Sequence, residues 1–384
     1  MRKRMKKRMG IWLLTIGCLA AMFPMGTRAA APSSLSSLSA VLYEPTTGTV
    51  LYEKDAHTPR AMASTTKLMT ALLAAESGDL ARDVEATAAA VAVEGSALGL
   101  RAGDQISMED LITGLLLASG NDAANTIALT LDESLEAFAD RMNRRAAEIG
   151  MKESRFVTPS GLDGEGHAAS AYDMALLGAE VLKNPVLARI CATKTAEIEM
   201  GNPKRKVTVS NHNKLLRLYG DAIGMKTGFT KKSGKCLVSA ASRNGVTLIA
   251  VTLNGGDYWN DHIALHEYGF SLLEAVTPGL PDLPELPVAG GETGSLRLTA
   301  APPEAMILEK DRASALMMSV SLPRFLLAPV QPGQRVGEIC YWLDGKVLQR
   351  VPIEAEYPIA ARPVAGFSGR FREYIGLLLR GLLS

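Results

Sequence analysis

A break in composition near residue 280 limits what this 384-residue chain can fold into. Residues 277–291 contain four prolines and three glycines, a mixture that interrupts helices and strands and is typical of a linker. The chain is also longer than most single domains. We therefore expect a large domain over residues 30–275, a linker over 276–291 and a small domain over 292–362.

The segment before the linker mixes helix-like and strand-like patterns. Short apolar runs at 41–43 and 50–52 flank a Thr-Thr-Gly turn and predict a β-hairpin. Two longer runs, 236–241 and 247–253, are separated by Arg243-Asn244-Gly245, which is a strong hairpin signal. Apolar residues at helical spacing predict helices at four places: 64–77, 108–118, 133–149 and 174–182. The pattern as a whole predicts an α/β (α+β) domain.

The segment after the linker has short alternating runs instead. The clearest pair, 336–343 and 347–353, surrounds Asp344-Gly345 and predicts a β-hairpin in a small β-rich domain. Residues 363–384 return to helical spacing, with apolar residues on one face and arginines towards the other. This pattern predicts an amphipathic helix that lies on a membrane surface. A helix docked on the protein's own surface is the alternative.

The first 29 residues are typical of an export signal. Six lysines and arginines precede an apolar run over 11–23, and a small-residue stretch follows at 29–31. The apolar run is too short for a membrane span, and we expect cleavage after Ala29. Retention of this segment as an N-terminal anchor is the alternative. Export would place the protein on the extracytoplasmic face of the membrane or in the cell wall.

Charge and cysteine content narrow the function classes. Without residues 1–29 the chain has 34 basic and 40 acidic residues, and no basic stripe indicates nucleic acid. Cys191, Cys236 and Cys340 are spaced for neither a zinc site nor a disulfide scaffold, so we expect all three to be buried and reduced. His262 and His266 have helical spacing but no obvious third ligand, so we expect no metal.

Ser64 and Lys67 form the first of three short motifs that carry chemistry. Three residues apart on a predicted helix, they lie on one face within mutual reach. A serine hydroxyl is a weak nucleophile until a base takes its proton, and a lysine with a lowered pKa can be that base. Free N–H groups at the helix start can also stabilise a developing oxyanion. Alone, this spacing fits equally well an ordinary helix start with a solvated lysine.

Two further motifs follow in order. In the first, Ser119-Gly120-Asn121, the amide of Asn121 can hold a substrate amide and the hydroxyl of Ser119 can pass a proton to a leaving amine. In the second, Lys226-Thr227-Gly228, the lysine and the hydroxyl can bind a substrate carboxylate, and the glycine permits close approach of backbone. Each is individually compatible with an ordinary loop or turn. A Lys-Ser-Gly triplet at 232–234 has the same form, and we interpret it as a turn.

Together the three motifs resemble the S-x-x-K, S-x-N and K-T-G set of the penicillin-binding proteins and β-lactamases. The chain resembles the low-molecular-mass penicillin-binding proteins that are serine-type D-Ala-D-Ala carboxypeptidases, the S11 peptidases. The resemblance covers roughly residues 38–275 and includes the segments LYEKDAHTPRAMASTTKLMTALLA and TPSGLDGEGHAASAYDMALL. The segment DYWNDHIALHEYGF is similar to the sporulation-associated Gram-positive enzymes.

This resemblance implies a β-lactamase/transpeptidase-like catalytic domain followed by a small C-terminal β-rich domain and an amphipathic anchor. It implies Ser64 as the acylated nucleophile, Lys67 as its base, and a cleft shaped by Ser119 and Asn121. Substrate-binding residues would be Lys226, Thr227, Gly228 and Phe229, with the backbone N–H groups of Ser64 and Phe229 as the oxyanion hole. One feature departs from the family pattern: many relatives carry an arginine where residues 257–261 of this chain have none.

The resemblance implies removal of the terminal D-alanine from peptidoglycan stem peptides, with β-lactams as covalent inhibitors and no cofactor. An efficient β-lactamase would need a glutamate followed by x-x-Leu-Asn between Asn121 and Lys226, and no glutamate there has those neighbours. A non-catalytic wall-binding module is the rival from another class, but every motif side chain is present. Endopeptidase or transpeptidase side activity stays open.

Overall fold

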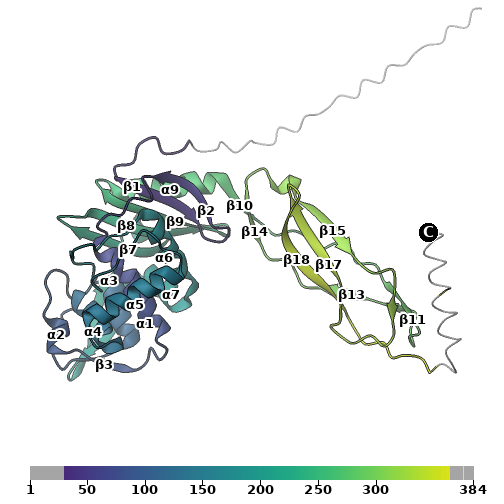
Figure 1. Cartoon of the computed structure of the whole chain (residues 1–384), viewed down its shortest axis with the longest axis horizontal. Helices are drawn as coiled ribbons and strands as arrows, with labels where there is room; N and C mark the ends of the chain where they lie inside the picture. Colours follow the sequence, from purple (N-terminus) through teal and green to yellow (C-terminus); the bar gives the residue numbers. More distant parts are fainter. Residues whose placement is uncertain (1–29, 364–374, 376–384) are drawn as a thin grey trace, which may run out of the picture.

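The computed structural model describes residues 30–363 and residue 375. Figure 1 shows two parts, a mixed helix and strand part and an elongated β-rich part that extends away from it. The predicted export signal over 1–29 and nearly all of the predicted amphipathic helix over 363–384 lie outside the described residues. Within the described ranges, no helix combines the length and the apolar character that crossing a membrane requires.

A five-stranded antiparallel sheet forms the centre of the first part, in the order β2-β1-β9-β8-β7. Its strands are β1 (Ser39–Glu44), β2 (Thr49–Lys54), β7 (Ala222–Thr230), β8 (Gly234–Arg243) and β9 (Val246–Gly255). Both predicted hairpins, β1–β2 and β8–β9, are confirmed. The second turns at Asn244 and Gly245, which both have positive φ, as this kind of hairpin requires.

Helices cover both faces of this sheet. The larger cluster packs on one face and consists of α1 (Lys67–Glu76), α3 (Met108–Leu117), α4 (Asn121–Leu131), α5 (Leu135–Glu148), α6 (Ala171–Lys183) and α7 (Pro185–Ala192). A single long helix, α9 (Tyr258–Leu272), packs on the other face. The four predicted helices correspond to η1–α1, α3, α5 and α6, with ends that differ by a few residues. This arrangement confirms the mixed fold class.

Two glycines let helices approach the sheet closely. A Cβ at Gly178 of α6 would lie 3.3 Å from Ile249 Cγ2 and 3.4 Å from Val238 Cγ1. A Cβ at Gly269 of α9 would lie 2.6 Å from Leu248 Cδ1 on the opposite face. Both faces of the central strands are therefore tightly covered, which explains why β8 and β9 are apolar along nearly their whole length.

A small second sheet and three short helices complete the first part. The sheet has the order β3-β4-β5-β6 and contains β3 (Asp83–Glu85), β4 (Gln105–Ser107), β5 (Thr195–Gly201) and β6 (Lys204–Ser210). The short helices are η1 (Ala63–Thr66), α2 (Ala88–Val91) and α8 (Leu215–Leu218). η1 runs directly into α1, so Ser64 lies at the start of a continuous helical segment, as predicted.

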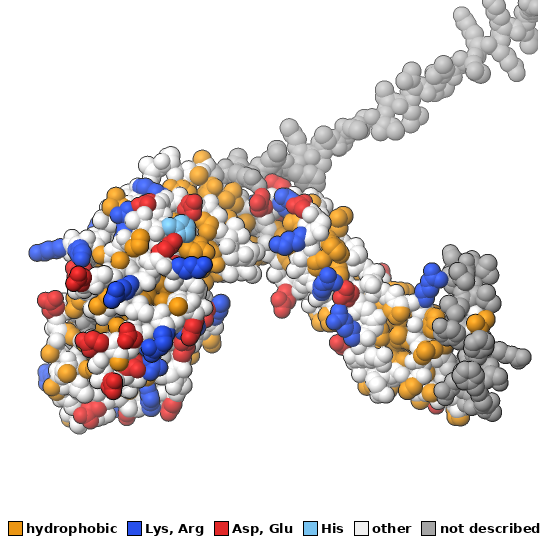
Figure 2. Space-filling model, viewed as in Figure 1, with side chains coloured by type: hydrophobic (Ala, Val, Ile, Leu, Met, Phe, Trp, Pro, Cys, Tyr) orange, Lys and Arg blue, Asp and Glu red, His pale blue; other side chains and the backbone are white. Residues whose placement is uncertain are grey.

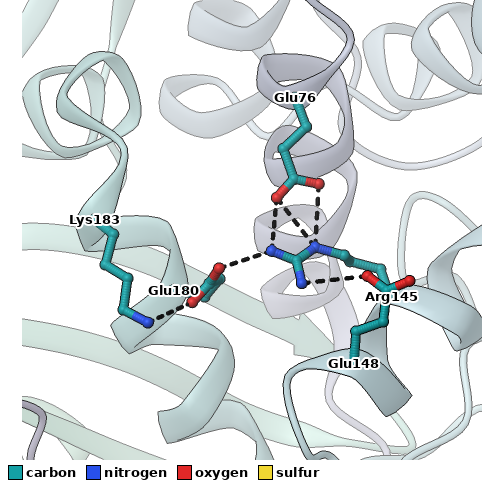
Figure 3. Close-up of polar contacts among 5 residues, drawn as sticks. All are labelled: Glu76, Arg145, Glu148, Glu180 and Lys183. Carbon is teal, nitrogen blue, oxygen red and sulfur yellow. Dashed lines mark hydrogen bonds and ion pairs between the residues drawn. The ribbon is translucent and has the colours of Figure 1, made fainter.

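Ion pairs join three helices on the first part (Figure 3). Arg145 of α5 lies between Glu76 of α1, at 2.8 Å, and Glu180 of α6, at 2.7 Å. Lys183 and Glu148 extend the network at its exposed edges. Elsewhere on the face shown in Figure 2, acidic and basic side chains are interspersed over both parts.

The β-rich part is built from three small sheets. A four-stranded sheet, β13-β18-β17-β15, contains β13 (Leu298–Ala300), β15 (Met317–Ser321), β17 (Arg335–Leu343) and β18 (Lys346–Ala355). The hairpin of β17 and β18 around Asp344-Gly345 was predicted and is confirmed. The other strands are β10 (Leu273–Val276), β11 (Leu286–Ala289), β12 (Ser295–Leu296), β14 (Met306–Glu309) and β16 (Leu326–Leu327), with η2 at Ala313–Ala315.

The linker predicted over 276–291 is too long at its C-terminal end, because strand β11 (Leu286–Ala289) lies within it. β10 pairs with β14, and β11 pairs with β12 and β16, so two segments near the proline-rich stretch belong to sheets. Leu286 and Val288 alternate with Pro287 and are both buried. Alternate apolar side chains are thus buried as in an ordinary strand, although the proline between them has no N–H to donate. Strand β11 is short, so the loss of this one hydrogen-bond donor is tolerated.

Candidate active site

A pocket of about 410 Å³ lies where the helices of the first part meet strand β7. Ser64, Ser119, Thr227, Gly228 and Phe229, all predicted site residues, line it. Six further residues line it that were not predicted: Ser96, His212, Lys214, Lys235, Tyr258 and Trp259. The structure therefore brings all three motifs together, although they are separated by many residues along the chain.

Ser64 and Lys67 are in contact at the base of the pocket. Lys67 Nζ lies 3.0 Å from Ser64 Oγ, which is hydrogen-bond distance, and the lysine is fully buried. The preceding residue, Ala63, has a φ of 48°, a backbone conformation that residues other than glycine rarely adopt and that is concentrated at functional sites. The predicted spacing of three thus gives a direct nucleophile–amine contact.

Two obligate acceptors surround the amine of Lys67. Asn121 Oδ1 lies 2.7 Å and the backbone carbonyl of Ser160 lies 2.5 Å from Nζ. The orientation of the Asn121 amide follows from its other end, because Nδ2 donates to the carbonyl of Glu94 at 2.7 Å. A neutral lysine has two N–H donors and one lone pair, so these acceptors take both donors and leave the lone pair for the hydroxyl of Ser64.

Burial lowers the pKa of Lys67 well below its usual value, and the charge of Lys226 adds to this effect while Asp122 opposes it. A lysine in this position is neutral far more readily than one in water. Geometry and electrostatics therefore agree, since the neutral amine is the form that can accept the proton of Ser64.

Lys226 forms a second lysine–serine contact across the pocket. Its Nζ donates to Ser119 Oγ at 3.1 Å and to the carbonyl of Thr227 at 3.0 Å. Burial lowers the pKa of Lys226 to about 7. Ser119 has a φ of 62° and closes a tight turn between α3 and α4. The two lysine–serine pairs thus approach the pocket from the helices and from the sheet.

Gly228 brings strand β7 against the start of the helix. A Cβ at this position would lie 2.9 Å from the carbonyl oxygen of Met62 and 3.0 Å from the backbone nitrogen of Ser64. The sequence predicted that this glycine permits close approach of substrate backbone. In the structure it permits close approach of the protein's own backbone, and so sets the width of the cleft beside Ser64.

Asn121 contacts Lys67 from the start of α4. It is buried, with both ends of its amide engaged, and it is not among the residues that line the pocket. The helix start at Asn121 points its side chain inward between Lys67 and the loop at 92–100, so that it orients the amine of Lys67. Its predicted role in holding a substrate amide stays a prediction.

That loop, residues 92–100, carries Ser96 to the pocket and was not predicted. Asp122 is buried and accepts hydrogen bonds from the backbone N–H groups of three loop residues: Leu98 at 2.7 Å, Gly99 at 2.8 Å and Leu100 at 3.0 Å. Asp122, the acidic residue directly after the Ser-Gly-Asn motif, is the one sequence feature that could have indicated this loop. Its partners are backbone N–H groups, which have no signature in the sequence, so its role is evident only from the structure.

The other side chains singled out in the sequence lie outside the pocket. Cys191, Cys236 and Cys340 are buried and free, as predicted. The Lys-Ser-Gly triplet at 232–234 is a turn, as predicted, in which Ser233 Oγ accepts from the N–H of Thr230 at 2.9 Å. Within the described ranges no group of His, Cys, Asp and Glu residues could hold a metal ion. His262 and His266 instead contact Ser239 in the core.

Comparison with protein families gives one decisive match. Residues 25–257 match the peptidase S11 model, described as D-alanyl-D-alanine carboxypeptidase. The chain belongs to this family. Residues 283–358 also match the model of the penicillin-binding protein 5 C-terminal domain, and this span contains the small β-sheets.

Individual S11 relatives extend over nearly the whole chain. D-alanyl-D-alanine carboxypeptidase DacF of Bacillus subtilis is 30% identical and the match covers 90% of this chain and 92% of the relative. The DacC enzyme of Escherichia coli is 30% identical over 89% of this chain and 88% of its own length. Penicillin binding protein 5 of Haemophilus influenzae has the same fold, with a TM-score of 0.64 and 26% identity over 86% of this chain and all of that structure.

As an S11 peptidase the chain is a serine hydrolase of the D-Ala-D-Ala carboxypeptidase type. The mixed helix and strand architecture and the β-rich C-terminal part also agree with the structures of this family.

Proposed function

We propose that this S11 carboxypeptidase removes the terminal D-alanine from peptidoglycan stem peptides through an acyl-enzyme on Ser64. The observation that carries the proposal is the environment of Lys67. Both of its neighbours other than Ser64 are obligate acceptors, at 2.7 and 2.5 Å, so the neutral amine directs its lone pair at the Ser64 hydroxyl. A buried lysine with a lowered pKa in contact with a serine hydroxyl is the arrangement that base catalysis requires.

The first step forms the acyl-enzyme. Ser64 Oγ attacks the carbonyl carbon of the penultimate D-alanine while its proton passes to Lys67 Nζ. The peptide C–N bond then breaks, and the leaving nitrogen takes the proton that Lys67 accepted, passed on through the hydroxyl of Ser119, whose Oγ is held 3.1 Å from Lys226 Nζ. Lys67 is neutral again after this transfer. Terminal D-alanine departs as the free amino acid.

The second step hydrolyses the ester. Water gives a proton to the neutral Lys67 and its oxygen attacks the acyl carbon, and the bond from that carbon to Ser64 Oγ breaks. Ser64 recovers its proton from Lys67, and the shortened stem peptide leaves. The backbone N–H groups of Ser64 and Phe229 are proposed to stabilise the oxyanion in both steps, and the close approach of β7 at Gly228 supports this assignment.

Substrate binding is assigned to strand β7. Thr227 lines the pocket beside Ser64, and the buried Lys226 before it donates to the carbonyl of Thr227. β-Lactams are proposed to acylate Ser64 as well, in keeping with the penicillin-binding proteins among the similar structures.

A peptidoglycan substrate places the site of action outside the cytoplasm, at the cell wall. The signal-like residues 1–29 and the amphipathic pattern over 363–384 support export and attachment to the membrane surface.

The test measures both the mass of the protein after exposure to penicillin and the release of D-alanine from a peptide substrate. The full chain without residues 1–29 is incubated with benzylpenicillin and weighed intact, and D-alanine release is measured from diacetyl-Lys-D-Ala-D-Ala. We expect one long-lived adduct and D-alanine release from the unaltered chain, and neither from Ser64→Ala. An adduct or release that persists in Ser64→Ala would refute the assignment of the nucleophile, and a lack of both in the unaltered chain would refute the proposed function.

A further inference from the structure

We propose that Lys235, a residue outside the three motifs, is a specificity-determining residue that binds the terminal carboxylate of the substrate. This inference rests on the proposed function, because it names a group that recognises the same substrate. It rests on three properties of Lys235: its place in the sheet, the contacts that hold its side chain, and the engagement of the other charged groups nearby.

The sheet places Lys235 on the same face as Thr227. Lys235 is the direct antiparallel partner of Phe229, and Thr227 lies two residues before Phe229 on the same strand. Side chains two apart on a strand share a face, and diagonal neighbours across a pair are about 7–8 Å apart. All three residues line the pocket. A carboxylate that accepts from the hydroxyl of Thr227 is therefore within the span of the Lys235 side chain.

Two contacts fix the ammonium group of Lys235. Its Nζ donates to the carbonyl of Gly256 at 2.9 Å and lies 5.6 Å from the centre of the Tyr258 ring. These contacts hold the charge at the pocket wall and use one of its three N–H donors, so two donors are left for a ligand. The hydroxyl of Thr227 likewise has no hydrogen-bond partner among residues 30–363. A cation and a hydroxyl on one face are thus both available.

The other lysines of the pocket are less suited to this role. Lys67 and Lys226 are buried and each is engaged with a serine and a carbonyl. Lys214 lines the pocket, but no hydrogen bond or ion pair to the described part of the chain fixes its ammonium group. Of the cations at the pocket wall, Lys235 is the one held in place before a ligand arrives, and a held group loses less entropy on binding.

No acid competes for Lys235. None of the described residues that line the pocket is acidic. The nearest acids in sequence to its partner Gly256 are engaged elsewhere: Asp257 accepts from Asn260, and Asp261 accepts from Ser36 and from the N–H of Ser37. The charge of Lys235 is thus unneutralised and faces a pocket that binds a substrate ending in a carboxylate.

The test uses a matched pair of acylating probes, benzylpenicillin and its methyl ester, which lacks the free carboxylate. Second-order acylation rates are measured by intact mass for Lys235→Met, Lys235→Arg and the control Lys231→Met, an exposed lysine outside the pocket lining. We expect Lys235→Met to slow acylation by benzylpenicillin about tenfold, the lower range for a charge-assisted hydrogen bond at an exposed side chain. The rate with the ester should stay within about twofold, and Lys235→Arg should restore most of the loss.

The peptide substrate provides a second readout. For D-alanine release from diacetyl-Lys-D-Ala-D-Ala, Lys235→Met should raise KM about tenfold with kcat within about threefold, while Lys231→Met leaves both nearly unchanged. An unchanged KM, or equal losses with the acid and the ester, would overturn the role of Lys235. If the unaltered chain neither releases D-alanine nor is acylated, it is the proposed function that fails instead, so the two failures are distinguishable.

Discussion

The two faces of the five-stranded sheet each carry a serine hydroxyl in contact with a nitrogen base. On the face of α1, Ser64 Oγ lies 3.0 Å from Lys67 Nζ. On the face of α9, Ser239 Oγ lies 2.6 Å from His262 Nδ1 and 2.8 Å from His266 Nε2. By distance alone the second cluster fits a serine nucleophile with its base as well as the first does.

What differs is access. Ser64 lines a pocket of about 410 Å³, whereas Ser239, His262 and His266 are completely buried and belong to the packed interface between α9 and the sheet. Burial lowers the pKa of the base on both faces, well below the usual value for Lys67 and to about 3 for His266. Only at the pocket can the neutral base meet a substrate. A short hydroxyl–base distance therefore shows only that the two groups are hydrogen-bonded. Whether the pair can be catalytic depends on its access to a substrate.

The sharpest test of this comparison exchanges each serine for alanine. Ser64→Ala should reduce kcat for D-alanine release by at least about 10⁴-fold, because the attacking oxygen is lost. Ser239→Ala should leave kcat/KM within about twofold and lower the free energy of unfolding by roughly 1–3 kcal/mol, because two buried histidine nitrogens lose a partner. Steady-state kinetics and urea unfolding measure the two. Loss of activity in Ser239→Ala at full folding would contradict the distinction drawn here.

Removal of the base from the accessible face should have the next largest effect. Lys67→Met keeps the buried stem but removes the amine, and we expect acylation by benzylpenicillin to slow about 10²–10⁴-fold. Lys67→Arg should be no better, since a guanidinium stays protonated and has no lone pair. Stopped-flow and intact-mass rates measure both variants. A fast Lys67→Arg variant would show that a charge, and not a base, is required there.

The buried histidines should make stability depend on pH. Burial lowers the pKa of His266 to about 3, whereas the unfolded chain titrates near the usual value of 6.5. Between these values the unfolded chain binds more protons, so the free energy of unfolding is unaffected above pH 6.5 and falls by about 1.4 kcal/mol per pH unit as the pH drops towards 3.

Replacement of His266 isolates this contribution. His266→Leu removes one titrating group. Between pH 6.5 and 4 the free energy of unfolding, measured with urea, should therefore fall by roughly 3 kcal/mol less in this variant than in the unaltered chain. Identical slopes for the two proteins over this range would contradict the assignment of a neutral, buried His266.

The smallest effect on stability is expected from the partly exposed ion pairs that join helices α1, α5 and α6. Arg145 bridges Glu76 and Glu180 on the first part (Figure 3), and Arg145→Met should lower the free energy of unfolding by about 1 kcal/mol, with kcat/KM unchanged. Lys183→Met is the control, because its side chain is 73% exposed and its ion pair should contribute less than about 0.5 kcal/mol. Thermal unfolding of both variants measures the difference, and an equal loss in the two would show that the bridge adds nothing beyond a single exposed pair.

Local patterns in the sequence were sufficient to predict many of the helices, hairpins and motif residues of this molecule. The hairpins at 44–49 and 243–246, the helix after Ser64 and the hairpin at 344–345 all depend on turn chemistry or on periodic burial within a few residues. The motif serines and lysines were predictable for the same reason, since each motif is a short spacing. β11 was missed because Pro287 and the three prolines before it suggested a linker, although Leu286 and Val288 alternate into the core.

Long-range partners of the site were not predictable. The carbonyl of Ser160 contacts Lys67, but a backbone carbonyl has no sequence signature; only Gly161, whose Cβ would lie 2.0 Å from the carbonyl of Ala63, marks the close approach. Lys235 could not be assigned to the site from the sequence, because only its pairing with Phe229 of strand β7 brings it to the pocket. Asn121 was assigned to the substrate because its type fits, while its direction depends on Glu94 and Lys67.

The strand order has a consequence for the growing chain. β1 lies between β2 and β9, and an isolated two-stranded hairpin is marginal in water. Ser64 and Lys67 are synthesised long before strand β9 (Val246–Gly255). The central sheet cannot form without β9, because β9 joins β1 to β8. Until β9 is made, strand β1 lacks this neighbour, and the sheet that carries β7 beside Ser64 is incomplete. The site therefore depends on a sheet whose strands come from both ends of the first part of the chain.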